Sequence, residues 1–133
     1  MLQIAQQFAT LIDRKEFDEV KPFLAEDCTY HYFEGSYSGR DNIANIYRML
    51  QKFGDDDFDE IVVSSEVDEL PDGKYRIRFN DLLRLGERWH ALHSEELVTV
   101  EDGLIRHIEH LSFPEEARAL MDFIRESRDI ANA

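Results

Sequence analysis

The chain has 133 residues, a length that is typical of one domain with its own hydrophobic core. Its formal net charge of −14 argues against binding to nucleic acid or to an anionic membrane, because like charges repel. No apolar run approaches the roughly 18 residues that span a bilayer, and the N-terminus lacks the basic start of a signal peptide. The single cysteine, Cys28, suits a reducing compartment. We therefore expect a cytoplasmic location.

The first half of the chain predicts three helices and one strand. Residues 1–17 carry apolar side chains at helical spacing, and residues 18–24 form a second, shorter helical segment. Residues 28–33 are rich in β-forming side chains and predict a strand. A third helix is expected from Asp41, which is a suitable N-cap, to Gly54.

The second half predicts a series of strands followed by one helix. Strands are expected over residues 61–67, 74–85, 89–100 and 104–113, with turns at Pro71-Asp72-Gly73, Gly86 and Asp102-Gly103 between them. Pro114 then begins a C-terminal helix. Helices that are segregated from a mainly antiparallel sheet predict an α+β fold.

A cation site is not predicted, although acidic residues and histidines are numerous. The run from Asp55 to Glu60 lacks the regular ligand spacing and the central glycine of a calcium loop, so we interpret it as a solvated acidic loop. His93, Glu95 and His110 could supply three zinc ligands, but the sequence has no H-E-x-x-H motif. We predict no metal and no cofactor.

Three passages of the sequence carry a family resemblance. They are residues 17–30, Ser38-Gly39-Arg40-Asp41-Asn42-Ile43 and Glu101-Asp102-Gly103-Leu104-Ile105. In chain order they resemble the passage from the second helix into the first strand, the entry to the third helix and the turn before the last strand in the NTF2-like, SnoaL-like superfamily, which includes ketosteroid isomerase, polyketide cyclases and scytalone dehydratase. The resemblance implies a cone in which three N-terminal helices pack on a strongly curved, mainly antiparallel sheet and enclose a pocket.

The resemblance also implies how the chain is organised and how it associates. Residues 1–113 correspond to the NTF2-like domain, and residues 114–133 form a C-terminal helical extension of the same domain. The convex face of the sheet often forms a dimer in this superfamily, so we expect a homodimer through that face. The pocket implies a small organic molecule as the partner, of a cyclic or polyketide-like kind.

The chain aligns with ketosteroid isomerase without a gap from Phe8 to Tyr32 and from Gly86 to Ser112, and three of its positions fall on functional positions of that enzyme. Tyr32 stands where the isomerase has its general-base aspartate, Phe8 where it has an oxyanion-hole tyrosine, and Glu95 where it has a protonated aspartate. The base and one oxyanion donor are therefore missing. Steroid isomerisation by that mechanism is not expected here.

Strand alternation extends this alignment to a predicted pocket. If Glu95 points inward, the side chains that share its face are Trp89, Ala91, His93, Leu97, Arg78, Asn80 and Leu82, and on the last strand Arg106, Ile108, His110 and Ser112. A slip of one residue would exchange Glu95 for Glu96, and a single bulge would reverse any of these faces. His93 and His110 are also consistent with structural roles in the sheet.

The predicted pocket contains an acid–base set. Histidine exchanges protons near neutral pH, so His93 and His110 are the expected acid and base. Glu95 would donate a proton or orient a histidine, and Tyr32 and Asn80 would bind a substrate oxygen. We predict a cofactor-independent lyase, isomerase or cyclase that acts on a carbonyl compound. The alternatives are a non-catalytic ligand-binding or dimer-scaffold protein, and a protein-interaction module with an exposed apolar patch.

Overall fold

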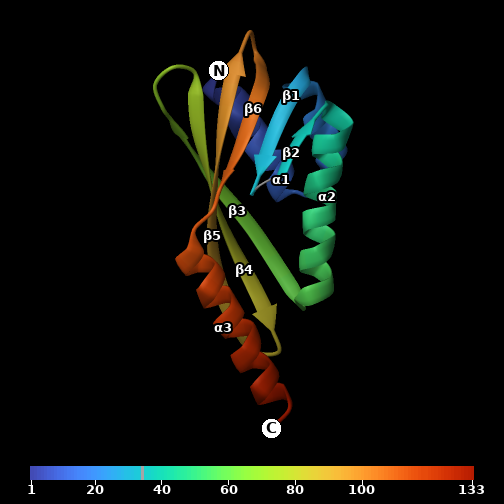
Figure 1. The fold of residues 1–133 in the computed structure, drawn as a ribbon, viewed down its shortest axis with the longest axis vertical. Coiled ribbons are helices and arrows are strands. Elements are labelled where there is room, and N and C mark those ends of the chain that lie inside the picture. Colours follow the sequence, from blue (N-terminus) through green and yellow to red (C-terminus); the bar gives the residue numbers. More distant parts are fainter. Residues whose placement is uncertain (34) are drawn as a thin grey trace.

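A computed structural model describes residues 1–33 and 35–133 (Figure 1). Its elements in chain order are α1 (Leu2–Asp13), the 3-10 helix η1 (Phe17–Phe23), β1 (Leu24–Tyr32), β2 (Gly35–Ser38), α2 (Arg40–Asp57), β3 (Glu60–Glu69), β4 (Lys74–Leu85), β5 (Arg88–Glu101), β6 (Leu104–Leu111) and α3 (Pro114–Ala131). The predicted α+β class is confirmed. In the described part of the chain, no helix is long and apolar enough to cross a membrane.

All six strands form one sheet, in the order β2-β1-β6-β5-β4-β3. The β1–β6 pair is parallel and the other pairs are antiparallel, so the sheet is mixed. The hairpins between β3, β4, β5 and β6 lie where the turn residues predict them. Asp102 and Gly103 both have positive φ angles, 52° and 78°, and Glu101 pairs with Leu104, as a two-residue hairpin turn requires.

The hydrophobic core lies on the inner face of the sheet, beneath α1 and α2. On β4 the buried side chains are Tyr75, Ile77, Phe79 and Leu83, and the residues between them are more exposed. Phe8 of α1 is completely buried in the same core. This alternation assigns one face of β4 and of its neighbours to the core.

The C-terminal helix extends the covered area beyond the last strand. On the β5 side, β6 pairs with the second half of β5 alone, from Glu95 onward. The first half of β5 instead contacts α3, where the guanidinium of Arg88 donates to the Ser127 hydroxyl at 3.1 Å and the ring of His90 stacks on Phe123. In the view of Figure 1, α2 lies to the right and α3 to the left of the lower parts of β3 and β4. Residues of both helices line the cavity that is described below.

Three local predictions differ from the structure. The second helix is a 3-10 helix that contains Pro22, and β1 begins at Leu24 instead of residue 28. A short strand, β2, lies between β1 and α2, where no strand was expected. Residues 55–57 of the acidic run form the last turn of α2, because Gln51 and Lys52 contact Asp55 and Asp56 one turn later.

Candidate functional site

A cavity of about 560 Å³ opens on the inner face of the sheet between α2 and α3. Close approach of α2 to β3 closes one side of it, because a Cβ atom at Gly54 would lie 2.6 Å from Cδ1 of Ile61. Most of the lining is apolar. The apolar side chains around it include Phe17, Phe58, Ile61, Val63, Phe79, Leu83, Leu92, Phe113 and Leu120. This is the composition expected of a small-molecule site with a few polar groups that fix orientation.

Glu96 of β5 places a carboxylate in the wall of this cavity with only 2% of the residue exposed. The hydroxyl of Tyr30, on β1, donates to Oε2 at 2.8 Å, and the hydroxyl of Tyr47, on α2, donates to Oε1 at 2.7 Å. A buried carboxylate is tolerated only when hydrogen bonds replace the lost water. The two tyrosines meet this need and join two strands and a helix at one point.

The two tyrosines act as donors. Burial, together with the nearby Glu96 carboxylate, raises the pKa of both the Tyr30 and the Tyr47 hydroxyl well above the ordinary value. Both hydroxyls therefore stay protonated at neutral pH. Their protons point to Glu96, which leaves the carboxylate as the acceptor.

His110 of β6 lies beside the same carboxylate. Its Nδ1 is 3.5 Å from Oε2 of Glu96, which is longer than a good hydrogen bond and is an ion pair only when the imidazole is protonated. The carboxylate favours the tautomer with the proton on Nδ1, which leaves the Nε2 lone pair free to accept a proton. The rings of Tyr32 and Phe33 pack against the imidazole at centroid distances of 4.7 and 5.7 Å. This packing holds the ring of His110 at the cavity wall.

Tyr32 supplies a second polar group at this end of the cavity. Burial and the Glu96 carboxylate raise the pKa of its hydroxyl, so the group remains a hydrogen-bond donor. No hydrogen bond of the Tyr32 hydroxyl is found among the described residues, whereas the hydroxyls of Tyr30 and Tyr47 are both engaged. Tyr32 is thus the tyrosine here that is available to a ligand.

Asp81 of β4 is a further carboxyl in the cavity wall, at some distance from Glu96. Its cross-strand partner on β5 is Leu92, four residues before Glu96, so the two Cα positions are separated by about 13 Å along the strands at ~3.3 Å per residue. Burial and the neighbouring Asp13 carboxylate raise the pKa of Asp81 to about 6. Its Oδ1 atom is buried and has no hydrogen-bond partner in the described chain.

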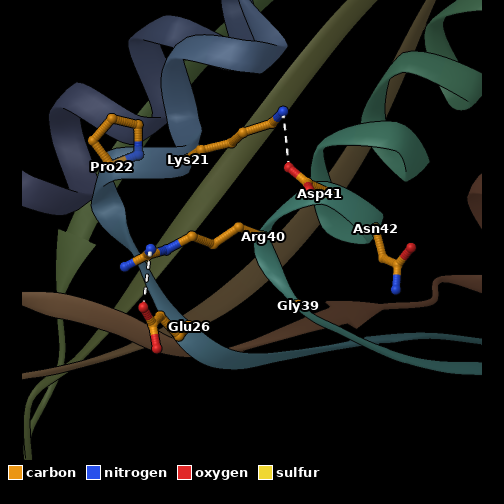
Figure 2. A pocket seen from close by; sticks show the side chains of 7 residues that line it. All are labelled: Lys21, Pro22, Glu26, Gly39, Arg40, Asp41 and Asn42. Carbon is orange, nitrogen blue, oxygen red and sulfur yellow. Dashed lines mark ion pairs between the residues drawn. The ribbon is translucent and has the colours of Figure 1, made fainter.

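A larger hollow, of about 720 Å³, lies outside the sheet at the start of α2 and is open to solvent. Figure 2 shows that its two cations are already paired, Lys21 with Asp41 and Arg40 with Glu26. The N–O distances are 3.0 and 3.9 Å. These neighbouring carboxylates compete with any anion, so we assign the candidate site to the cavity between α2 and α3.

Comparison of the sequence with protein-family models and with curated proteins finds no match. Solved structures do match. A Sinorhizobium meliloti protein that is provisionally named a polyketide cyclase superposes with a TM-score of 0.66 at 15% identity, over 84% of this chain and 95% of that one. An NTF2-like protein of unknown function from Cytophaga hutchinsonii gives 0.61 at 13% identity, over 84% and 88%. The chain has the NTF2-like fold.

A de novo designed protein with a curved β-sheet also matches, with a TM-score of 0.63 at 16% identity, over 96% of this chain and 93% of that one. A fold similar to that of this chain therefore also occurs in a designed protein. Function has to be argued from the cavity's own residues.

Some of the sequence-predicted site residues do lie at the cavity. Tyr32, His110 and Ser112 line it, and His93 borders it. The ring of His93, however, is hydrogen-bonded to Asn80 at 3.2 Å and to Glu95 at 2.6 Å, on the side of β5 opposite Glu96. Glu95 and His93 therefore meet, as an acid–base pair would, but on the outer face.

The predicted inward orientation of Glu95 is wrong, and so are those of the other residues of β4 and β5 that were assigned by the same alternation. Arg78 binds Glu66 and Asp68, and Asn80 contacts His93. Leu82 and Trp89 are 45% and 47% exposed. Each lies on the outer face because the buried positions of β4 and β5 have the opposite parity.

Two further predicted ligand contacts, Phe8 and Ile108, are completely buried in the core and do not line the cavity. The cavity also has polar residues that were not predicted, among them Glu96, Tyr30, Tyr47 and Asp81. The alternation of apolar residues along β4 contains the signal that could have found Glu96 and Asp81. No group of three or more potential metal ligands is found in the described chain.

Proposed function

We propose that this protein is a cofactor-independent acid–base enzyme, a lyase, isomerase or cyclase, that acts on a small cyclic or polyketide-like carbonyl compound. The observation that carries the proposal is the contact between His110 and the buried Glu96 at the wall of an apolar cavity. A histidine that is oriented by a carboxylate and has one free ring nitrogen is suited to general-base chemistry.

In the proposed reaction, the Nε2 atom of His110 removes a proton from the carbon next to the substrate carbonyl. The electrons of that C–H bond form a carbon–carbon double bond, and the carbonyl π electrons move to the oxygen, which accepts a hydrogen bond from the Tyr32 hydroxyl. The protonated His110 then returns the proton to another carbon, or to a hydroxyl group that leaves as water. Glu96 stabilises the imidazolium between the two transfers, and the proton balance closes without a cofactor.

Glu96 is a positioning residue in this scheme. Tyr30 and Tyr47 hold its two carboxylate oxygens, so the orientation of the carboxylate is fixed before a substrate binds. Rigid support of this kind is what allows a charged group to act on a neighbouring histidine. The roles that the sequence suggested for Glu95 and His93 are transferred to Glu96 and His110.

A non-catalytic ligand-binding protein is the second candidate. Tyr30 and Tyr47 favour it, because they already satisfy both oxygens of Glu96. The buried carboxylate is then explained without a chemical role for Glu96 and His110. The largely apolar wall would bind a hydrophobic molecule without reaction. The two candidates differ in whether a bound ketone exchanges its α-hydrogens.

We also propose that the outer face of the sheet forms the contact of a homodimer. Val62 pairs with Leu82 and Leu82 pairs with Ala91, so these side chains are direct neighbours on that face. Val62 and Leu82 are each 45% exposed, and the nearby Trp89 is 47% exposed. An apolar strip of this kind is typical of a protein contact.

The cytoplasmic location stays a prediction.

Hydrogen–deuterium exchange tests the proposed chemistry on a simple ketone, so the natural substrate is not needed. The probe is para-cyclohexylcyclohexanone in deuterated buffer, and NMR follows the loss of its α-hydrogens. We expect the wild-type protein to accelerate exchange, and His110→Gln to lose about a hundredfold or more of the acceleration, as expected for removal of a general base. Glu96→Gln should lose a smaller part.

Glu95→Gln is the matched control, because it is the same substitution one residue away on the outer face. This variant should accelerate exchange of the ketone's α-hydrogens as much as the wild type does. Nitrogen-15 NMR reports the tautomer of His110, which a general loss of stability would not change. We expect the Nδ1–H tautomer to be lost in Glu96→Gln and kept in Glu95→Gln. Exchange no faster than in buffer, with the ketone bound, would establish the binding protein instead.

A further inference from the structure

Asp81 has none of the support that Glu96 has. No hydrogen bond and no ion pair of the Asp81 side chain is found within residues 1–33 and 35–133, and its Oδ1 atom is fully enclosed. Glu96, by contrast, receives two hydroxyl protons. Asp81 is half-buried, and a carboxylate that loses part of its water without gaining a partner is costly to the folded protein. An unsatisfied group of this kind calls for an explanation, and a bound ligand is one.

The residues around Asp81 increase this cost. Asp13, at the end of α1, is close enough for its carboxylate to disfavour the charge on Asp81. Asp13 is itself held by the hydroxyl of Ser65, which donates to its Oδ2 at 2.6 Å, and its Oδ1 is also buried without a partner. No lysine or arginine forms an ion pair with either aspartate in the described chain. The local excess of negative charge attracts a cation.

The position of Asp81 in the cavity defines where that cation would sit. Asp81 lines the cavity, and so do Phe79 and Leu83 on either side of it along β4. The Cα positions of Asp81 and Glu96 are separated by about 13 Å along the strands. Because the side chains at both ends take up part of this distance, the remaining length suits a molecule of two rings. One molecule can therefore reach the His110 end and the Asp81 end together.

We propose that Asp81 is a specificity-determining residue that binds a protonated amine at the end of the substrate opposite its carbonyl group. The substrate class is then an amine-bearing cyclic ketone, and this inference rests on the proposed function of the cavity. A charge-assisted hydrogen bond inside an apolar wall is among the stronger polar contacts available to a ligand. The same bond satisfies the carboxylate that the fold leaves unpaired.

Two matched ketones test the proposal. The neutral probe is para-cyclohexylcyclohexanone, and the cationic probe is its piperidine analogue, in which the ring CH2 farthest from the carbonyl is replaced by NH and protonated at neutral pH. Calorimetry measures the affinity of each for the wild type. We expect the amine to bind about tenfold or more tightly than the neutral ketone, and Asp81→Asn to abolish this preference.

Asp129→Asn is the control for long-range electrostatics, because it removes the same charge from an exposed position near the end of α3. It should keep the preference for the amine. No preference in the wild type, or an undiminished preference in Asp81→Asn, overturns the proposal. The exchange assay reports separately on the proposed chemistry, so a preference for the amine without exchange would remove the enzyme proposal and retain the amine site.

Discussion

The hydroxyl of Tyr47 on α2 donates a 2.7 Å hydrogen bond to Glu96 on β5, and this contact joins the helix to the inner face of the sheet. The ring of Tyr47 is also fixed. It packs edge-on against Phe8 at 5.9 Å and against Tyr30 at 5.4 Å, and it stacks on Phe17 at 6.4 Å. The aromatic packing sets the position of the hydroxyl, and the hydroxyl sets the position of the carboxylate.

Tyr47→Phe removes one of the two donors to the buried carboxylate and keeps the packing of the ring. We expect the free energy of unfolding to fall by about 1–3 kcal/mol, the cost of leaving a buried acceptor without its partner. Chemical denaturation measures the change. Tyr37→Phe is the matched control, because Tyr37 is 43% exposed and its hydroxyl makes no hydrogen bond in the described chain. Equal losses in both variants would show that the Glu96 contact does not stabilise the fold.

Cys28 should be unreactive in the folded protein. It is fully buried in β1, and burial together with the adjacent Asp27 raises the pKa of its thiol to about 12. Because only the thiolate attacks disulfide reagents, we expect modification of the native protein at pH 8 to be at least about a hundredfold slower than that of the denatured protein. Absorbance of the released thiol reagent follows both rates. Rapid labelling without unfolding would contradict the burial of this strand.

The secondary structure could be predicted from the sequence because its signals are local. Alternating side chains over residues 74–85 and the Asp102-Gly103 turn each depend on neighbours in the chain. The strand β2 could not be predicted in this way. Its four residues, of which the side chains of Ser36, Tyr37 and Ser38 are exposed, gain their pairing from β1.

The polar residues of β4 and β5 were misassigned by one position for a reason that the sequence itself contains. The alignment to ketosteroid isomerase placed Glu95 inside, although the apolar residues of β4, such as Ile77, define the buried face. The two-residue turn at residues 86–87 pairs Leu85 with Arg88, and counting back along the hairpin then pairs Ile77 with Glu96. Cross-strand partners share a face, so Glu96 is the inward residue.

Other parts of the site depend on contacts that no local pattern contains. The contact of Asp13 with Ser65 joins residues that are 52 positions apart, and it decides the surroundings of Asp81. In β6, the register shifts between the pairs Thr99–His107 and Val100–Ile105, which removes Arg106 from the regular alternation. Arg106 therefore lies among Asp27, Glu101 and Asp102 instead of in the cavity.

The proposed dimer predicts that a charge in the apolar strip of the outer face separates the subunits. Leu82→Glu places a carboxylate among Val62, Ala91 and Trp89 and, in a symmetric dimer, does so twice in one interface. We expect the dissociation constant from sedimentation equilibrium to rise at least about tenfold, given the ~1.5–3 kcal/mol that burial of one leucine contributes. Met121→Glu, at a 66% exposed position of α3, should leave association unchanged. A monomeric wild type would rule the dimer out.

Asp81→Asn should stabilise the protein at neutral pH even as it removes the proposed amine site. The pKa of Asp81 rises from 3.8 to about 6 on folding, so the folded protein holds this proton more tightly than the unfolded chain does. Stability from this group is therefore complete below about pH 4 and is lost as the pH rises through about 6. Asparagine at this position is uncharged, like protonated Asp81, so the variant does not lose stability as the pH rises. We expect a gain of about 3 kcal/mol at pH 7, or about 10 °C in Tm, and little gain at pH 4.

Thermal unfolding of Asp81→Asn, Asp129→Asn and the wild type at both pH values measures this difference. The exposed control should change Tm by a similar small amount at the two pH values. A stabilising substitution in a cavity wall is the signature of a residue kept for binding at the expense of the fold. If the Asp81→Asn gain were the same at pH 4 as at pH 7, Asp81 would not be an uncompensated charge in the folded protein, and the physical basis of the amine site would be lost.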